Sequence, residues 1–183
     1  VCSSDLVGGA ANAVEAAAAA GVARVLAFSS GAVYGKGPED AAVLDEDATD
    51  PTPATLYAVT KFAGERLALR LGEVHGVAVC TPRIGIAWGR WEHRTGARAT
   101  PSPLHQALGL LRRSEAVRLP LDTRLPLIEA GDAAEALLRL AASEAVGPVN
   151  LGPGRVTPVR EVAAALDASG AGVAPKRHKT TEK

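Results

Sequence analysis

The sequence predicts an α/β protein built on a parallel β-sheet, and three observations carry this prediction. Two short apolar runs, 22–28 and 77–80, have the length and composition of buried strands. A segment with helical periodicity, 54–71, lies between them. An alanine-rich segment, 7–20, precedes the first run and favours a helix. Buried strands joined through a helix form a βαβ unit, in which the strands run parallel.

The first helix is expected to stop at Gly21, because glycine readily adopts the left-handed conformation that ends many helices. The first strand ends at Ser29 and Ser30. The stretch 31–53 is glycine-rich and then acidic with prolines, which indicates a surface loop.

The helix 54–71 is expected to alternate apolar and polar positions, as an amphipathic helix does. Its apolar positions are Phe62, Leu67, Leu69 and Leu71, and its polar positions are Lys61, Glu65, Arg66 and Arg70.

Beyond Gly89 the sequence favours shorter elements. Asp132 is expected to open a helix over 131–144 with Glu135 as its capping-box partner. Thr157 and Pro158 are expected as the N-cap and first turn of a last helix. The remaining expected elements are a helix over 103–113 and strands over 117–121 and 149–151.

Composition excludes several classes of protein. The chain has 183 residues, 47% of them hydrophobic, and a formal net charge of zero, which argues against nucleic-acid or membrane partners held by bulk charge. No apolar run reaches the about 20 residues that span a bilayer. Two cysteines, Cys2 and Cys80, cannot form a disulfide framework, so a cytoplasmic location is expected. The histidines show no metal-ligand spacing, so no metal site is expected.

The strongest chemical feature is Tyr57 with Lys61, which share a helix face at a spacing of four residues. An ammonium beside a phenol favours the phenolate, and such a tyrosine can exchange a proton with an alcohol or a carbonyl. Ser29 and Ser30 end a strand, and ligands of open α/β sheets bind beyond such ends. The alternatives are a solvated lysine beside a packed tyrosine and serines that only cap a strand.

Three segments carry a resemblance to a family. Phe-Ser-Ser-Gly-Ala-Val-Tyr-Gly at 28–35, Leu-Tyr-Ala-Val-Thr-Lys at 56–61 and Ile-Glu-Ala-Gly-Asp-Ala-Ala-Glu-Ala at 128–136 resemble the extended short-chain dehydrogenase/reductases, the NAD-dependent epimerase/dehydratase family. The resemblance spans 7–168. It implies the C-terminal part of a Rossmann-type doubly wound parallel sheet plus a small α/β substrate domain.

The resemblance also implies residue roles. Tyr57 would be the general acid/base, and Lys61 would promote its ionisation and bind the ribose of the nicotinamide cofactor, NAD or NADP. Ser30 would position the substrate oxygen, while spacing makes Ser29 the weaker choice for that role and leaves it as a cofactor contact. Pro82 and Arg83 would line the nicotinamide pocket, with a structural role as the alternative. Apart from the resemblance, Trp91 and Arg94 are candidates for contact with an anionic substrate, with an exposed loop as the alternative.

Departures from the family pattern narrow the expected reaction. Gly31 and Ala32 follow Ser30 where dehydratases carry Asp-Glu, which leaves epimerisation or oxidation and reduction of a nucleotide-sugar-like substrate or a small alcohol or ketone. Ile86 replaces a common asparagine. The family's glycine-rich phosphate loop is missing, so we expect an N-terminally truncated and inactive fragment.

The expected organisation has four parts and one small-molecule site. A homodimer through helices 7–20 and 54–71 is expected, and the alternative function is a non-catalytic dinucleotide-binding sensor or scaffold. The parts are a non-native leader over 1–6, a partial NAD(P)-binding domain with the catalytic residues over 7–85, a substrate-binding domain over 86–170 and a flexible tail over 171–183.

Overall fold

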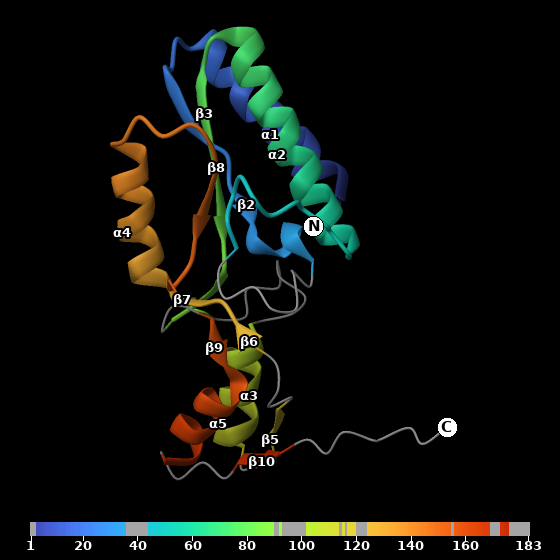
Figure 1. Ribbon diagram of the computed structural model, residues 1–183, viewed down its shortest axis with the longest axis vertical. Helices are drawn as coiled ribbons and strands as arrows, with labels where there is room; N and C mark the ends of the chain where they lie inside the picture. The colour runs from blue at the N-terminus through green and yellow to red at the C-terminus, as the bar shows by residue number, and fades with distance from the viewer. Residues whose placement is uncertain are drawn as a thin grey trace.

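The structure is a computed structural model, and most of the chain lies in two bodies stacked along its long axis (Figure 1). One body holds a parallel sheet between helices, and the other holds two helices with short strands. The structure describes residues 3–35, 44–89, 92, 102–113, 115, 117–119, 124–154, 156–168 and 173–175.

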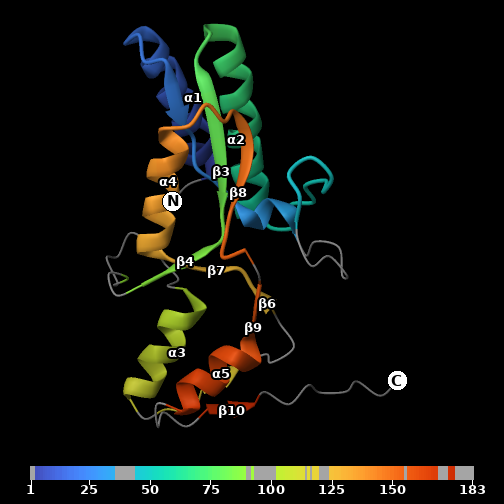
Figure 2. The same cartoon turned by 60° about the vertical axis from the view of Figure 1, so that its left-hand side comes forward.

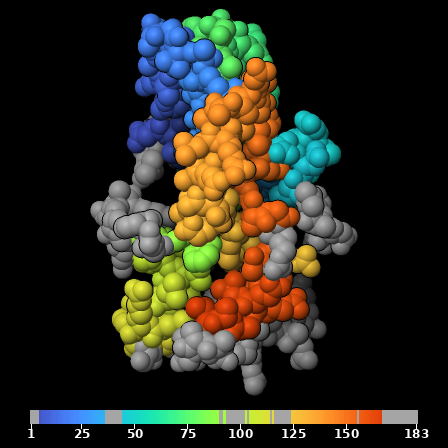
Figure 3. Space-filling model, turned by 90° about the vertical axis from the view of Figure 1, so that its left-hand side faces the viewer, coloured from blue at the N-terminus to red at the C-terminus, as the bar shows by residue number. Residues whose placement is uncertain are grey.

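The central sheet is wholly parallel, as predicted. Strands β1 (Arg24–Leu26) and β2 (Ser29–Ser30) pair in succession with one edge of β3 (Ala78–Ile84), and β8 (Gly147–Leu151) pairs with the other edge. Helices α1 and α2 cover one face and α4 covers the other (Figures 1 and 2). Figure 3 looks onto the α4 side, where this helix lies over the sheet. The chain is therefore an α/β, doubly wound structure of the Rossmann type.

Helix α1 (Ser3–Ala19) begins inside the segment expected as a leader, and the leader itself remains a prediction. The stop at Gly21 is confirmed, because its φ of 68° is left-handed. The expected loop opens instead with a short 3-10 helix, η1 (Gly31–Tyr34).

Helix α2 (Leu56–His75) begins behind Thr55, whose hydroxyl oxygen accepts a hydrogen bond from the Ala58 amide at 3.1 Å. Burial along this helix does not simply follow the polarity of the side chains. Leu67 is 36% exposed, whereas Glu65 is only 2% exposed because it pairs with an arginine described below. The other buried positions of the helix are small residues, namely Ala58, Thr60, Gly64, Ala68 and Gly72. Gly64 and Ala68 face α1, where a Cβ at Gly64 would lie 3.5 Å from Cβ of Ala10 and Ala68 packs with Val14.

The segment expected as the substrate domain contributes to both bodies. Its strand β8 and helix α4 (Ala130–Ala141) complete the central sheet and one of its covering layers. Strands β4 (Ile86–Trp88) and β7 (Leu127–Glu129) pair in parallel at the junction between the bodies (Figure 2). A boundary at residue 86 therefore marks where the chain leaves the sheet, to which it returns at β8.

The second body contains α3 (Pro103–Arg112) and α5 (Val159–Ala168), which bury Ala107 against Leu166. Strand β5 (Val117–Leu119) pairs with β10 (Val173–Pro175), so the segment expected as a tail begins with a paired strand.

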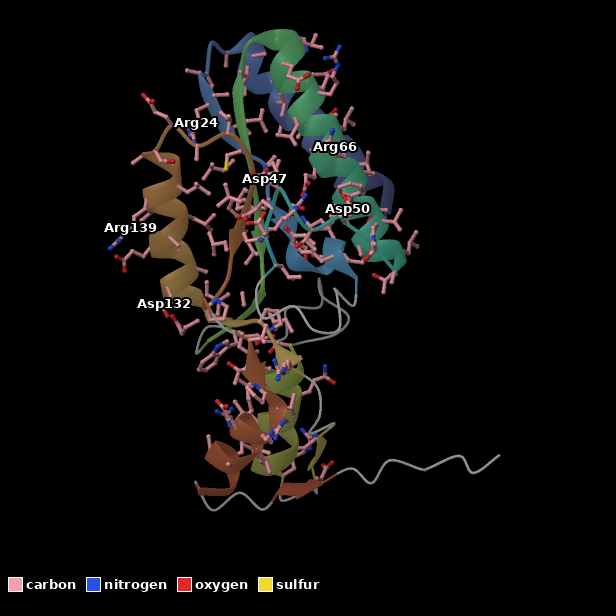
Figure 4. All side chains as sticks on the ribbon, in the orientation of Figure 1. Arg24, Asp47, Asp50, Arg66, Asp132 and Arg139 are labelled. Atoms are coloured by element: carbon pink, nitrogen blue, oxygen red, sulfur yellow. The ribbon has the colours of Figure 1, made fainter. Side chains whose placement is uncertain are left out.

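Two predicted helix starts were wrong. The N-cap of α4 is Glu129, whose carboxylate accepts hydrogen bonds from the backbone amides of Gly131 and Asp132. Glu135, expected to complete the cap, instead pairs with Arg139 on the outer face of the helix (Figure 4). Thr157–Pro158 forms strand β9 and pairs antiparallel with β6 (Arg124–Leu125), so α5 starts one residue later.

Two apolar clusters hold the sheet between its helices. Val14, Ala68, Val77 and Val79 pack on the α1 and α2 side, and Ile128, Ala133 and Leu151 pack on the α4 side. Arg24 fastens β1 to the end of α4, since its guanidinium donates to the carbonyl oxygens of Leu140 and Ala145 (Figure 4). None of the helices that the structure describes has the length and apolar character that a membrane crossing requires.

The close approach of α2 to β3 makes Gly72 sensitive to substitution. A Cβ there would lie 2.5 Å from Cγ2 of Val79 and 2.8 Å from the carbonyl oxygen of Val77. Gly72→Ala is therefore expected to lower the free energy of unfolding in urea by about 1–3 kcal/mol. The matched control is Gly8→Ala in α1, where a Cβ meets nothing within 4 Å and helix propensity favours alanine. Equal effects of the two substitutions would contradict this account of the packing.

Candidate active site

The serine and arginine positions meet at the carboxyl edge of the sheet. Ser29 is the register partner of Arg83, and Ser30 is the partner of Ile84. The N-terminal end of α2 and the turn η1 lie beside this edge (Figure 1). The fold therefore gathers residues of α2, β2 and β3 at the edge where open α/β sheets bind ligands.

Lys61 is fixed to the strand that leads to the serines. Its Nζ donates to the carbonyl oxygen of Phe28 at 2.7 Å, across the junction between β1 and β2. The side chain is half-buried, and this burial lowers the pKa of the Lys61 ammonium. Lys61 thus carries its charge at the sheet edge in a partly desolvated place.

Tyr57 lies one helical turn before Lys61, in the first turn of α2. Its side chain is 51% exposed, so the phenol is open to a ligand. The backbone beneath it is held by Thr60, whose hydroxyl donates to the carbonyl oxygen of Tyr57 at 3.0 Å. The carbonyl oxygen of Tyr57 is thus engaged within the helix, while its phenol is accessible.

The two serines differ in orientation. Ser30 caps η1, and its hydroxyl oxygen accepts from the Ala32 amide at 3.2 Å, which leaves the hydroxyl hydrogen for donation. Ser29 is 4% exposed, and its Oγ has no hydrogen-bond partner in the described part of the chain. The burial of Ser29 favours Ser30 as the serine presented to a substrate, and a cofactor contact by Ser29 stays a prediction.

Arg83 is engaged inside the protein. Its Nε and Nη2 donate to the two carboxylate oxygens of Glu65 at 3.1 and 2.7 Å. Its Nη1 donates to the hydroxyl oxygen of Tyr34 at 2.6 Å, and the guanidinium also lies 4.8 Å from the centre of that ring. With 4% of its surface exposed, the Arg83 side chain favours the structural alternative over direct cofactor contact.

The network continues to the segment that leads into α2. The Tyr34 hydroxyl donates to Oδ1 of Asn150 at 3.0 Å, and the Asn150 side chain donates to the carbonyl oxygen of Leu44 at 2.7 Å. The backbone amide of Asn150 also donates to the carboxylate of Glu46. These bonds tie η1 and residues 44–46 to β8.

The sequence patterns did not identify Glu65, Tyr34 or Asn150 as parts of the site. The signal for Glu65 was its place four residues after Lys61, on the same helix face as Tyr57. Pro82 is fully buried in β3, next to Arg83. Trp91 and Arg94, expected to contact substrate, lie outside the described residues.

A cavity of about 270 Å³ lies between α1, β1 and α2. Its ionisable side chains are Asp5, Lys61 and Glu65, and the remainder of its lining is mostly apolar. Within the described residues, no cluster of three or more His, Cys, Asp or Glu side chains is arranged to hold a metal ion.

Comparison with known proteins identifies the family of the chain. The family model described as the NAD dependent epimerase/dehydratase family matches residues 4–152. The chain belongs to this family. The resemblance carried by the serine, Tyr-Lys and later aspartate segments is thereby confirmed, and the matched range includes every strand of the central sheet.

Solved structures of the same fold include sugar-nucleotide enzymes. MoeE5 in complex with UDP-glucose and NAD shares 27% identity over 97% of this chain and 59% of its own, with a TM-score of 0.76. The enzyme WbmG of Bordetella bronchiseptica, in complex with NAD, shares 25% identity over 97% of this chain and 53% of its own, with a TM-score of 0.72. The UDP-N-acetylglucosamine 4-epimerase of Methanobrevibacter ruminantium M1 shares 17% identity over 98% of this chain and 58% of its own, with a TM-score of 0.81. At this identity the similarity shows the fold alone.

The chain thus spans between 53% and 59% of the length of these three structures. Among curated proteins, no relative matches it.

Proposed function

We propose that the protein containing this chain is an NAD(P)-dependent epimerase or oxidoreductase that acts on a nucleotide-sugar-like substrate or a small alcohol or ketone. The observation that carries the proposal is Lys61, bonded to the Phe28 carbonyl oxygen at 2.7 Å, one turn from the exposed phenol of Tyr57. Membership of the family and the NAD complexes of MoeE5 and WbmG support the same assignment.

The residues at the sheet edge fit the nicotinamide end of such a cofactor. An ammonium has three donors, and the Phe28 carbonyl takes one from Lys61, so two remain for ribose hydroxyls. A nicotinamide cofactor would supply a reversible hydride acceptor for the substrate carbon. Tyr57 and Lys61 would hold the ribose beside that carbon, while the cofactor contacts of Ser29 and Pro82 remain part of the proposal.

The chain's own residues handle the proton. The Ser30 hydroxyl would donate a hydrogen bond to the substrate oxygen. Tyr57, as phenolate, would accept the proton of the substrate hydroxyl while the C–O bond of the substrate becomes a carbonyl. The Lys61 ammonium stabilises the phenolate by its charge. In the reverse direction Tyr57 returns the proton, so an epimerase and a reductase can use the same groups.

Dehydration is less favoured than these reactions. Gly31 and Ala32 follow Ser30 in η1, and neither has an ionisable side chain that could protonate a leaving hydroxyl. This leaves the carbonyl–alcohol exchange at Tyr57 as the chemistry of the site.

We also propose that the protein forms a homodimer through α1 and α2 in a reducing, cytoplasmic compartment. Large apolar side chains of α2 are exposed and available to a second copy, namely Leu56, Val59, Leu67 and Val74. Cys80 is a free, buried thiol, which suits a reducing compartment.

Product analysis tests the proposed reaction. The gene product, at its full encoded length, is incubated with UDP-sugars and small ketones and with NAD or NADP. An epimerase is expected to convert a sugar into its epimer with trace cofactor and no net reduced nicotinamide. An oxidoreductase is expected to yield one reduced or oxidised cofactor per product. The absence of turnover over the whole panel, with cofactor bound, would instead support a sensor or scaffold.

A further inference from the structure

A carboxylate stands one turn from the ammonium of the proposed site. Tyr57, Lys61 and Glu65 follow one another at four-residue spacing on α2 and therefore share a face of the helix. Lys61 and Glu65 line the same cavity. A lysine and a glutamate at this spacing ordinarily attract each other and can form an ion pair.

The structure keeps these two charges apart. Both carboxylate oxygens of Glu65 are taken by Arg83, and the two side chains of this pair are 0% and 4% exposed. Lys61 turns instead to the Phe28 carbonyl oxygen, and within the described residues it forms no ion pair. The ammonium thus belongs to a residue one helical turn from a carboxylate whose charge is already compensated.

We propose that Arg83 is a positioning residue that withholds the Glu65 carboxylate from Lys61 and so leaves the ammonium charge available to Tyr57. This proposal rests on the roles proposed for Tyr57 and Lys61. A bidentate guanidinium–carboxylate pair is fixed in geometry and close to neutral as seen from a neighbouring group.

The charged and titratable groups around Lys61 determine whether the loss of Arg83 raises or lowers the pKa of Lys61. Asp5 of α1, which is exposed, shares the cavity with Lys61, and Tyr57 and Glu65 flank it on α2. Arg83 of β3 lies behind Glu65, and Tyr34 of η1 lies behind Arg83.

Without Arg83, the Glu65 carboxylate would have Lys61 within one helical turn as a counter-ion. An opposite charge raises the pKa of a lysine, against the lowering that burial causes here. The Tyr57 phenolate would then compete with a carboxylate for the same ammonium.

NMR titration of the full-length gene product without cofactor tests the proposal. Carbon-13 labels in the lysine side chains report each ammonium, and the signal that Lys61→Gln removes is that of Lys61. Arg83→Gln is expected to raise the titration midpoint of Lys61 by about one pH unit. Glu65→Gln, which leaves the arginine charge uncompensated, is expected to lower the midpoint. The double variant, which restores neutrality, is expected to return it close to the wild-type value.

An exposed ion pair on the same helix provides the matched control. Arg70 and Glu73 are 72% and 66% exposed, so Arg70→Gln and Glu73→Gln are expected to leave the Lys61 midpoint unchanged. If Arg83→Gln does not fold, the other two variants test the proposal. The Lys61 midpoint is then expected to be lowered in Glu65→Gln and restored in the double variant.

A Lys61 midpoint that stays at the wild-type value in folded Glu65→Gln overturns the proposal, as does a double variant that fails to restore it. Because these midpoints are measured without turnover, they stand apart from the catalytic assignment. Loss of the proposed function with the predicted midpoints intact would refute catalysis and leave the charge arrangement in place.

Discussion

Tyr57→Phe is expected to lower kcat/KM of the NAD(P)-dependent reaction by about a thousandfold, a typical loss for a general acid–base residue. The substitution removes only the hydroxyl that exchanges a proton with the substrate oxygen. Because the side chain is 51% exposed, the free energy of unfolding is expected to stay within about 0.5 kcal/mol of the wild-type value. Steady-state kinetics on the full-length gene product and urea unfolding measure the two effects.

The other tyrosine gives the matched control. Tyr34 is 1% exposed, and its hydroxyl is bonded to Arg83 and Asn150. Tyr34→Phe is expected to lower the free energy of unfolding by about 1–3 kcal/mol, since it leaves buried polar groups short of a partner. Its effect on turnover in the folded enzyme is expected to be much smaller than that of Tyr57→Phe. Wild-type turnover in Tyr57→Phe would refute the catalytic assignment.

Arg83→Leu is expected to destabilise the fold by about 3–5 kcal/mol, because it leaves the carboxylate of Glu65 buried without a counter-ion. Each partner of this pair is at most 4% exposed, so water cannot replace the lost bonds without opening the packing of α2 on β3. Urea unfolding followed by circular dichroism gives the change in free energy.

Two comparisons isolate the cause of that loss. Replacing both Glu65 and Arg83 with leucine is expected to cost less than Arg83→Leu alone, since no unpaired charge remains. Arg70→Leu breaks the exposed pair with Glu73 and is expected to cost less than about 1 kcal/mol. Equal losses for Arg83→Leu and Arg70→Leu would show that burial of the pair contributes nothing.

The sequence patterns predicted the half of the central sheet formed by α1, β1, α2 and β3, and predicted that the proposed catalytic residues lie at the end of a strand and on one face of a helix. The apolar runs before Ser29 and Pro82 predicted parallel strands, and the spacing of Tyr57 and Lys61 predicted a shared helix face. These features depend on local periodicity and on the direction of strands, both of which are readable from a single chain.

Features that depend on distant partners were not predictable in the same way. Glu65 was expected among the polar positions of α2, and only Arg83, 18 residues away, explains its burial. Thr157 and Pro158 have the composition of a helix start, yet pairing with β6 makes them a strand. The return of β8 to the sheet likewise depends on its pairing with β3 rather than on its own brief apolar run.

Transfer of a deuterium label tests the central claim most directly. Full-length protein with oxidised NAD or NADP bound is mixed with a nucleotide sugar that carries deuterium on its reacting carbon. The reaction is quenched during turnover, and the reduced nicotinamide present at that moment is analysed for the label. We predict that the label reaches the nicotinamide in the wild-type protein and falls to background in Tyr57→Phe, while both proteins still bind cofactor. Wild-type protein that binds both cofactor and sugar without transferring any label would contradict the account.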